Sequence, residues 1–241
     1  MSGAELQEHL ITLAEVPALV ASIGAPTAAA ERGTVLVLHG LTASKEVQRT
    51  EAHSLAAQGY LAVTIDAVGH GARHYHDFDD RFSPERGERS FFEVVQRTAD
   101  ELPSVLEALD QRGWTRPGRL GAFGFSMGGF ILFGAMSSHC AFDAAATVVA
   151  SPRWLHVPES PHERLDRFFP TPLLLQTAEL DTTVPPSDAR DLHQALMRRY
   201  ASAPERLRYV EYPGEHHMLS EPAWRLSWAE VLDWFERFLK G

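Results

Sequence analysis

The sequence predicts an α/β fold with a mostly parallel central sheet and helices on both of its faces. Short apolar runs alternate with longer segments whose apolar residues recur at helical spacing. The run TVLVLHG at 34–40 is continuously apolar and ends in glycine, which is typical of a strand buried on both faces of a sheet. Alternation of strand and helix favours parallel pairing, because each helix returns the chain to the same edge of the sheet.

The individual elements follow from the same periodicities. Further strands are expected at 60–67, 119–126, 144–151, 171–179 and 206–213. Helices are expected at 45–59, 90–113, 127–139, 187–201 and 222–240. The first apolar stretch, 9–24, is expected to add an antiparallel edge.

Composition limits the class of protein. The chain has 241 residues, of which 44% are hydrophobic and 22% charged, the balance of a folded globular protein. No repeat or linker divides it, so we expect a single domain over 1–241. The formal net charge of -10 leaves no basic stripe, and nucleic acid is therefore not an expected partner.

Localisation is predicted from what the sequence does not contain. No apolar run approaches the roughly 18 residues of a membrane helix, and the beginning of the chain resembles no signal peptide. The single cysteine, Cys140, cannot form an internal disulfide, and its apolar surroundings favour a packed thiol. We expect a cytoplasmic protein with no membrane partner. The sequence leaves the oligomeric state open.

The most specific local motif is GFSMG at 124–128, between an expected strand and an expected helix. It matches G-x-S-x-G, in which the serine occupies a sharp turn from strand to helix. Gly124 and Gly128 allow strand and helix to approach closely there. Ser126 is therefore the candidate nucleophile.

Two backbone N–H groups are expected to stabilise negative charge beside this serine. The loop HGLTASKE at 39–46 follows the strongest early strand, and Gly40 lets its backbone turn toward the nucleophile. We assign the oxyanion hole to the N–H groups of Leu41 and Met127. His39 is interpreted as a structural imidazole that fixes the loop.

An acid and a base are expected in two later loops. AELDTTVPP at 178–186 follows a strand, and Asp181 is the carboxylate chosen to orient a histidine. Glu179 competes for this role but lies closer to the strand. Neighbouring residues of an extended loop point in opposite directions, so only one of His216 and His217 is expected to face the serine.

The order Ser126, Asp181, histidine is the chain order of the α/β-hydrolase fold. The sequence resembles the small bacterial carboxylesterases of that superfamily, in the branch related to dienelactone hydrolase and prolyl oligopeptidase. The motifs that carry the resemblance are HGLTASKE, DAVGHGAR, GFSMGG, LDTTVPP and PGEHH. They run from about residue 33 to the end of the chain.

The resemblance selects between the two histidines. The catalytic histidine of this family commonly ends a P-G-x-x-H pattern, which here identifies His217. The chain departs from the family pattern in two places: His216 stands where a small or acidic residue is frequent, and Ala178 replaces a glycine frequent before the aspartate. Neither change removes a catalytic group.

Two polar segments that contain proline, 68–90 and 151–169, are expected to form loops or a short cap over the site. From them we take His70 and Trp154 as substrate-binding residues, together with His216 as a wall of the site. The resemblance implies that three residues shape the loop after the strand without taking part in the chemistry: Asp66, His70 and Gly71.

No metal or other cofactor is expected. The cluster His70, His74 and His76 has aspartates nearby, but it lacks a metal-binding framework such as H-E-x-x-H. The short cap favours small or short-chain acyl substrates. The sequence thus predicts a serine carboxylesterase acting on a small-molecule ester.

Alternatives on the same triad are a thioesterase and a lactone hydrolase. A peptidase of the prolyl-oligopeptidase type would be expected to carry a large accessory domain, for which this length leaves no room. A non-catalytic ligand receptor with this fold is a further alternative.

Overall fold

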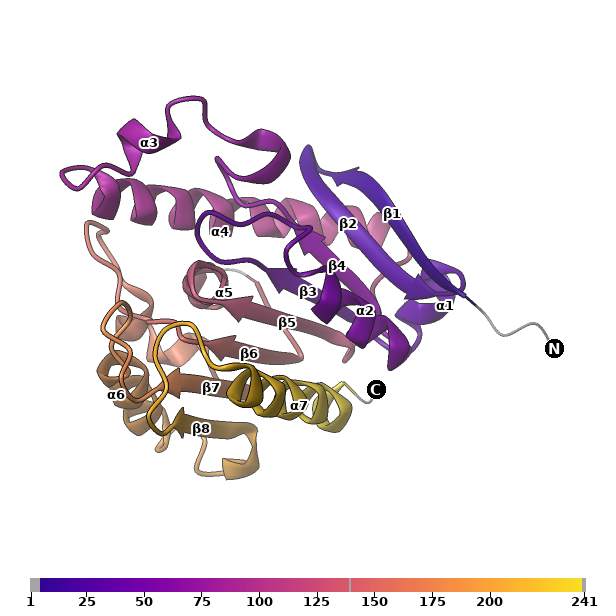
Figure 1. The fold of residues 1–241 in the computed structure, drawn as a ribbon. Coiled ribbons are helices and arrows are strands. Elements are labelled where there is room, and N and C mark those ends of the chain that lie inside the picture. Colours follow the sequence, from indigo (N-terminus) through magenta and orange to yellow (C-terminus); the bar gives the residue numbers. More distant parts are fainter. Residues whose placement is uncertain (1–4, 139, 240–241) are drawn as a thin grey trace.

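The computed structural model describes residues 5–138 and 140–239. Its centre is an eight-stranded sheet with the order β1-β2-β4-β3-β5-β6-β7-β8 (Figure 1). The strands are β1 (Leu6–Leu13), β2 (Val16–Ile23), β3 (Thr34–Leu38), β4 (Leu61–Ile65), β5 (Leu120–Phe125), β6 (Ala144–Val148), β7 (Leu173–Ala178) and β8 (Leu207–Tyr212). Strands β3 to β8 are parallel to one another, which confirms the predicted fold class.

The first two strands form the antiparallel edge expected from the sequence. They pair along their whole length, from Leu6 opposite Ile23 to Leu13 opposite Val16. Strand β2 then pairs antiparallel with β4, so the hairpin is attached to the parallel sheet on one side only. Most of β1 is exposed, whereas β2 is largely buried.

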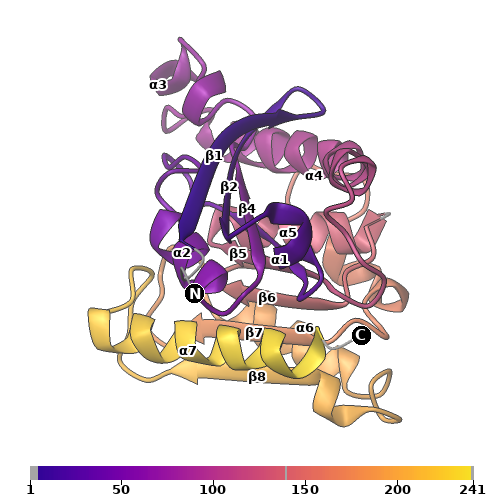
Figure 2. The ribbon, with the colours of Figure 1, turned by 90° about the vertical axis from the view of Figure 1, so that its right-hand side faces the viewer.

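Helices cover both faces of the sheet (Figures 1 and 2). They are α1 (Pro26–Ala30), α2 (Arg49–Ala57), α3 (Phe78–Arg81), α4 (Gly87–Gln111), α5 (Met127–Ser138), α6 (Ser187–Leu196) and α7 (Glu221–Phe238). Helices α4, α5 and α6 contribute to one apolar core cluster, and α2 and α7 contribute to the other. The expected helix ends at His139 and Lys240 lie outside the described residues.

Two irregular segments interrupt this alternation. Residues 68–90 contain a short 3-10 turn, helix α3 and the beginning of α4, and residues 151–169 contain two 3-10 turns. The two segments meet where Nε2 of His156 lies 2.6 Å from a carboxylate oxygen of Glu88. Among the described residues, no helix combines the length and apolar character that a membrane crossing needs.

The order of the strands determines which loops can meet. Strand β3 lies in the middle of the sheet, and the chain continues to β4 on one side and later to β5 on the other. Residues Leu38 and Gly124 stand side by side at the carboxyl ends of β3 and β5. Loops that diverge from such a point enclose a crevice, which is where ligands bind in open α/β sheets.

Candidate active site

Ser126 occupies a strained turn between β5 and α5. Its φ angle is 49°, in the left-handed region that residues with a side chain rarely adopt. A Cβ atom added to Gly128 would lie 2.1 Å from the carbonyl oxygen of Leu38, and one added to Gly124 would lie 2.4 Å from the backbone of Gly128. Strand and helix therefore touch through backbone alone, and the serine is raised above the sheet edge.

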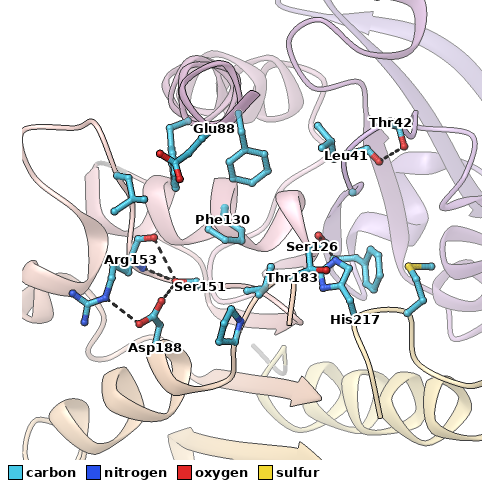
Figure 3. A pocket seen from close by; sticks show the side chains of 18 residues that line it. Leu41, Thr42, Glu88, Ser126, Phe130, Ser151, Arg153, Thr183, Asp188 and His217 are labelled. Atoms are coloured by element: carbon cyan, nitrogen blue, oxygen red, sulfur yellow. Dashed lines mark hydrogen bonds and ion pairs between the residues drawn. The ribbon is translucent and has the colours of Figure 1, made fainter. Parts of the chain in front are cut away.

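A chain of hydrogen bonds runs from this serine to a buried carboxylate. The Ser126 hydroxyl lies 2.9 Å from Nε2 of His217, and Nδ1 of His217 lies 2.8 Å from Oδ2 of Asp181 (Figure 3). A carboxylate only accepts hydrogen bonds, so Nδ1 carries the proton and Nε2 is free to accept from the hydroxyl. Asp181 is 4% exposed, and its other oxygen accepts the N–H groups of Thr183 at 2.9 Å and Val184 at 2.8 Å.

The loops that carry Asp181 and His217 are tied directly to each other. The Glu179 carboxylate accepts the N–H of Gly214 at 2.8 Å, and the N–H of Leu180 donates to the carbonyl of Glu215 at 2.8 Å. Nδ1 of His216 lies 3.1 Å from the carbonyl oxygen of Leu180. Glu179 and His216, the alternatives considered for the acid and the base, thus connect the two loops to each other.

The loop after β3, which is expected to supply an oxyanion N–H group, lies against Ser126. A Cβ on Gly40 would be 3.2 Å from the Phe125 ring and 3.7 Å from Cβ of Ser126. Thr42 has a φ of 62°, and its hydroxyl donates to the carbonyl of Leu41 at 2.7 Å, which fixes that peptide group. Met127 is the first residue of α5, where N–H groups have no acceptor within the helix. The loop after β3 and the beginning of α5 thus both adjoin Ser126.

His39 is a buried support for this loop. Its Nε2 accepts the N–H of Ala67 at 3.0 Å, so Nδ1 carries the proton and donates to the carbonyl of Gly40 at 2.7 Å. Burial lowers the pKa of His39 to about 4, despite the opposing hydrogen bond to Gly40. A neutral imidazole therefore bridges the loops after β3 and β4.

The second support is Asp66, which the resemblance implied to shape the loop after β4, but its partner Lys45 was not identified from the sequence. The Asp66 carboxylate accepts the backbone N–H of Lys45 at 2.9 Å, the Lys45 ammonium at 2.9 Å and the N–H of Ala72 at 2.8 Å. Burial tends to lower the pKa of Lys45, but hydrogen bonds to Glu46 and Asp66 outweigh it and raise the pKa. Gly71 leaves room for this carboxylate, because a Cβ there would lie 2.0 Å from Oδ1. The signal in the sequence was the pair of Lys45, in HGLTASKE, and Asp66, which directly follows the next strand.

Ser126 and His217 open into a cavity of about 590 Å³. Its middle is apolar, with walls from Phe91, Phe92, Phe130, Leu155, Val184 and Pro185. Polar side chains lie at the end opposite Leu41 and Thr42: Glu88, Ser151, Arg153 and Asp188 (Figure 3). Nε of Arg153 donates to Asp188 at 3.0 Å, and the Ser151 hydroxyl donates to the same carboxylate at 2.9 Å. The cavity thus offers an apolar channel that ends in charged groups.

The three expected substrate-binding residues do not line this cavity in the described part of the chain. His70 is fully buried, and its Nδ1 lies 2.8 Å from the carbonyl of Val68. Trp154 packs against α5, since a Cβ on Gly134 would lie 2.1 Å from its ring. His216 is exposed on the histidine loop.

The segment around Trp154 nevertheless contributes to the cavity. Its neighbours Arg153 and Leu155 are both exposed and both line the wall, whereas Trp154 is buried between them. Alternation along an extended segment was the signal that could have identified these two residues. In the described ranges, no group of three or more His, Cys, Asp and Glu side chains is arranged to hold a metal ion.

Comparisons with known proteins agree with this geometry. The family model described as serine aminopeptidase, S33, matches residues 29–167. The "Putative esterase YitV" of Bacillus subtilis (strain 168) is 24% identical over 235 residues, which cover 85% of this chain and 89% of that protein.

Solved structures share the fold over nearly the whole chain. TT1662 from Thermus thermophilus has a TM-score of 0.78 at 22% identity and covers 96% of this chain and 99% of its own. A "Putative Dienelactone Hydrolase" from Klebsiella pneumoniae subsp. pneumoniae MGH 78578 has a TM-score of 0.76 at 20% identity, with coverage of 97% and 100%. The family model spans more than half of the chain, so the protein belongs to the serine aminopeptidase S33 family and is a serine hydrolase of the α/β-hydrolase fold.

Proposed function

We propose that the protein is a carboxylesterase that hydrolyses small or short-chain acyl esters through an acyl-enzyme on Ser126. The observation that carries the proposal is the continuous chain of hydrogen bonds from Ser126 through His217 to Asp181, open to an apolar cavity. The similarity to a Bacillus subtilis protein named as an esterase supports the same chemistry. The reaction requires no cofactor.

Acylation begins with proton transfer from the Ser126 hydroxyl to Nε2 of His217. The serine oxygen attacks the ester carbonyl, and the carbonyl oxygen becomes an oxyanion that accepts hydrogen bonds from the N–H groups of Leu41 and Met127. Asp181 stabilises the imidazolium and keeps Nδ1 protonated. The tetrahedral intermediate then expels the alcohol, whose oxygen takes the proton from Nε2.

Deacylation repeats the sequence with water. His217 takes a proton from a water molecule as its oxygen attacks the acyl carbon of the acyl-enzyme. The second tetrahedral intermediate collapses, the Ser126 oxygen recovers the proton, and the carboxylic acid leaves. The same steps apply to thioesters and lactones, which differ only in the leaving group.

The shape of the cavity supports a preference for short acyl groups. Its apolar middle is bounded at the far end by the solvated Arg153–Asp188 ion pair and by Glu88. A long acyl chain would have to remove water from these charges without offering them a hydrogen bond, which is unfavourable. A short chain stays within the aromatic walls.

The test is an activity profile over p-nitrophenyl esters from acetate to dodecanoate, with thioesters and aminoacyl amides for comparison. We expect the highest kcat/KM for short acyl esters and covalent labelling of Ser126 by a fluorophosphonate probe. The Ser126→Ala variant serves as the control and should show neither. Turnover of amides alone, or equal labelling of the Ser126→Ala variant, would overturn the proposal.

A further inference from the structure

A second cavity, of about 440 Å³, adjoins the one that contains the nucleophile. The two share five wall residues: Gly40, Leu41, Thr42, Phe125 and Met218. The shared walls belong to the loop after β3, the end of β5 and the residue after His217. A molecule whose carbonyl carbon lies at Ser126 can therefore extend in two directions, one into each cavity.

The second cavity joins apolar side chains to one buried carboxyl group. Leu41, Val47 and Met218 line it and are large apolar residues with exposed fractions of 36%, 62% and 72%. Glu51, from the first turn of α2, lines the same cavity and is only 7% exposed. An exposed apolar rim around a buried acidic group contributes little to folding and is typical of a ligand-binding site.

Glu51 lacks the basic partner that a buried carboxylate normally has. Burial raises its pKa, and hydrogen bonds to its own backbone and to the Trp224 side chain only partly oppose this effect. Within the described residues, no lysine, arginine or histidine forms an ion pair with it. A ligand that brings a donor, above all a positively charged one, to this carboxyl group would therefore offset part of the cost of its burial.

The direction of each half of the substrate follows from the chemistry. The leaving oxygen must lie against Nε2 of His217, because that atom returns the proton to it. Met218 and Leu219, which directly follow His217, form a wall of the second cavity. Met218 also lines the larger cavity, together with Ser126 and His217, whereas Leu219 lines the second cavity alone. An alcohol half that extends from Nε2 of His217 past Met218 enters the second cavity, and the acyl half extends toward Phe130.

We propose that the second cavity is the alcohol subsite of the enzyme, and that it selects alcohols with an apolar body ending in a hydrogen-bond donor, a hydroxyl or an ammonium group, that binds Glu51. This inference rests on the proposed esterase function. Leu41, Val47 and Met218 contact the apolar body, and the Glu51 carboxyl group accepts from its far end.

The experiment compares three acetate esters, hexyl, 6-hydroxyhexyl and 6-aminohexyl acetate, which share one acyl group and differ only at the end of the alcohol. We expect kcat/KM of the wild type to be about tenfold higher for the 6-aminohexyl ester than for the hexyl ester, with the hydroxyl ester between them. In Glu51→Gln the higher kcat/KM for the 6-aminohexyl ester over the hexyl ester should disappear. Part of the preference for the 6-hydroxyhexyl ester should remain, because the glutamine amide oxygen still accepts a hydrogen bond. Thr50→Ala, exposed on the same helix, is the matched control and should keep the wild-type order.

Deacylation supplies an internal control. All three esters give the same acetyl-enzyme, so Glu51→Gln should leave the single-turnover deacylation rate unchanged. Butyl 6-aminohexanoate carries the ammonium on the acyl side, and butyl hexanoate is its counterpart without the donor. The ratio of their kcat/KM values should not depend on Glu51.

Val47→Trp, at the exposed rim of the second cavity, should lower kcat/KM for hexyl acetate more than for methyl acetate because the larger side chain fills the cavity.

The outcomes separate this inference from the proposed function. Equal kcat/KM for the three acetates in the wild type, or a Glu51-dependent preference on the acyl side, would overturn the alcohol subsite. The first result needs no variant, since it compares the three acetates in the wild type, so the inference can be overturned even where Glu51→Gln does not fold. Absence of both acetate hydrolysis and fluorophosphonate labelling would instead reject the esterase.

Discussion

The Lys45 ammonium group lies 2.9 Å from Oδ2 of Asp66, and both side chains are buried. The same carboxylate accepts the backbone N–H of Lys45, so it holds the loop after β3 to the end of β4. Asp66→Asn leaves the ammonium buried without its full counter-charge. We expect a loss of about 3 kcal/mol in the free energy of unfolding, measured by urea denaturation, and a fall in kcat as Leu41 moves.

Glu46 supplies the control for this prediction. It also contacts the Lys45 ammonium, at 2.7 Å, but is 36% exposed at its side chain. Glu46→Gln should therefore cost less than about 1 kcal/mol. Equal losses in the two variants would show that the buried pair does not anchor the loop.

The two adjacent histidines should behave asymmetrically. His217 contacts both Ser126 and Asp181, whereas the His216 ring contacts only a backbone carbonyl among the interactions of the described residues. His217→Ala should reduce kcat/KM by about 10³-fold or more, and His216→Ala by only a few fold. Rates for p-nitrophenyl acetate measure both, and the reverse pattern would assign the base to His216.

Asp181→Asn tests the tautomer of His217. An amide can present N–H to Nδ1 and so favour the tautomer with the proton on Nε2, which cannot accept from Ser126. We expect a fall in kcat of about 10⁴-fold with little change in stability. Glu179→Gln removes a charge two residues away and should retain most of the activity. A small effect of Asp181→Asn on kcat would contradict the assigned role.

Gly128→Ala should destabilise the fold. The new Cβ would lie 2.1 Å from the Leu38 carbonyl, so α5 must move away from β3. We expect a loss of about 3 kcal/mol or more in the free energy of unfolding. Gly113→Ala places its Cβ in open space at a φ of 67° and should cost only about 1 kcal/mol. Thermal and urea unfolding compare the two, and similar losses would rule out the close contact.

Acid should weaken the fold through His39. Burial lowers its pKa from 6.5 to about 4, so between these values the unfolded chain binds a proton that the folded chain does not. Stability contributed by the neutral imidazole is complete above pH 6.5 and is lost as pH falls toward 4, by up to about 3 kcal/mol. Unfolding at pH 7.5 and 4.5 should show a smaller loss for His39→Gln, which keeps one acceptor and one donor. Equal losses would contradict the assignment.

The sequence predicted the elements that depend on local pattern. All six expected parallel strands lie within two or three residues of their observed bounds, because each is a buried apolar run between polar loops. The turn at Ser126 was also predictable, since two glycines mark a close approach of strand and helix. The apolar stretch 9–24 predicted the antiparallel edge, but β1 begins earlier, at Leu6, and most of it is exposed, so its first residues carry no apolar pattern.

Contacts between distant loops were not predictable in the same way. Trp154 was expected in the cavity because it is aromatic, but the direction of its side chain depends on the gap that Gly134 leaves in α5. His70 was expected beside a substrate, yet it is buried next to the Phe78 ring. Glu51 has no distinguishing motif, and its burial and its contact with the distant Trp224 side chain depend on tertiary packing.

Long sequence separation within the triad has a consequence for folding. Ser126 and His217 are 91 residues apart, and Asp181 and His217 are 36 apart, so no local segment contains the reactive constellation. Closing such long loops is slow relative to forming helices or hairpins. Fluorophosphonate reactivity during refolding should therefore appear only after the loops beyond β7 and β8 have docked on the turn after β5. Labelling of Ser126 would then report when the native topology is complete.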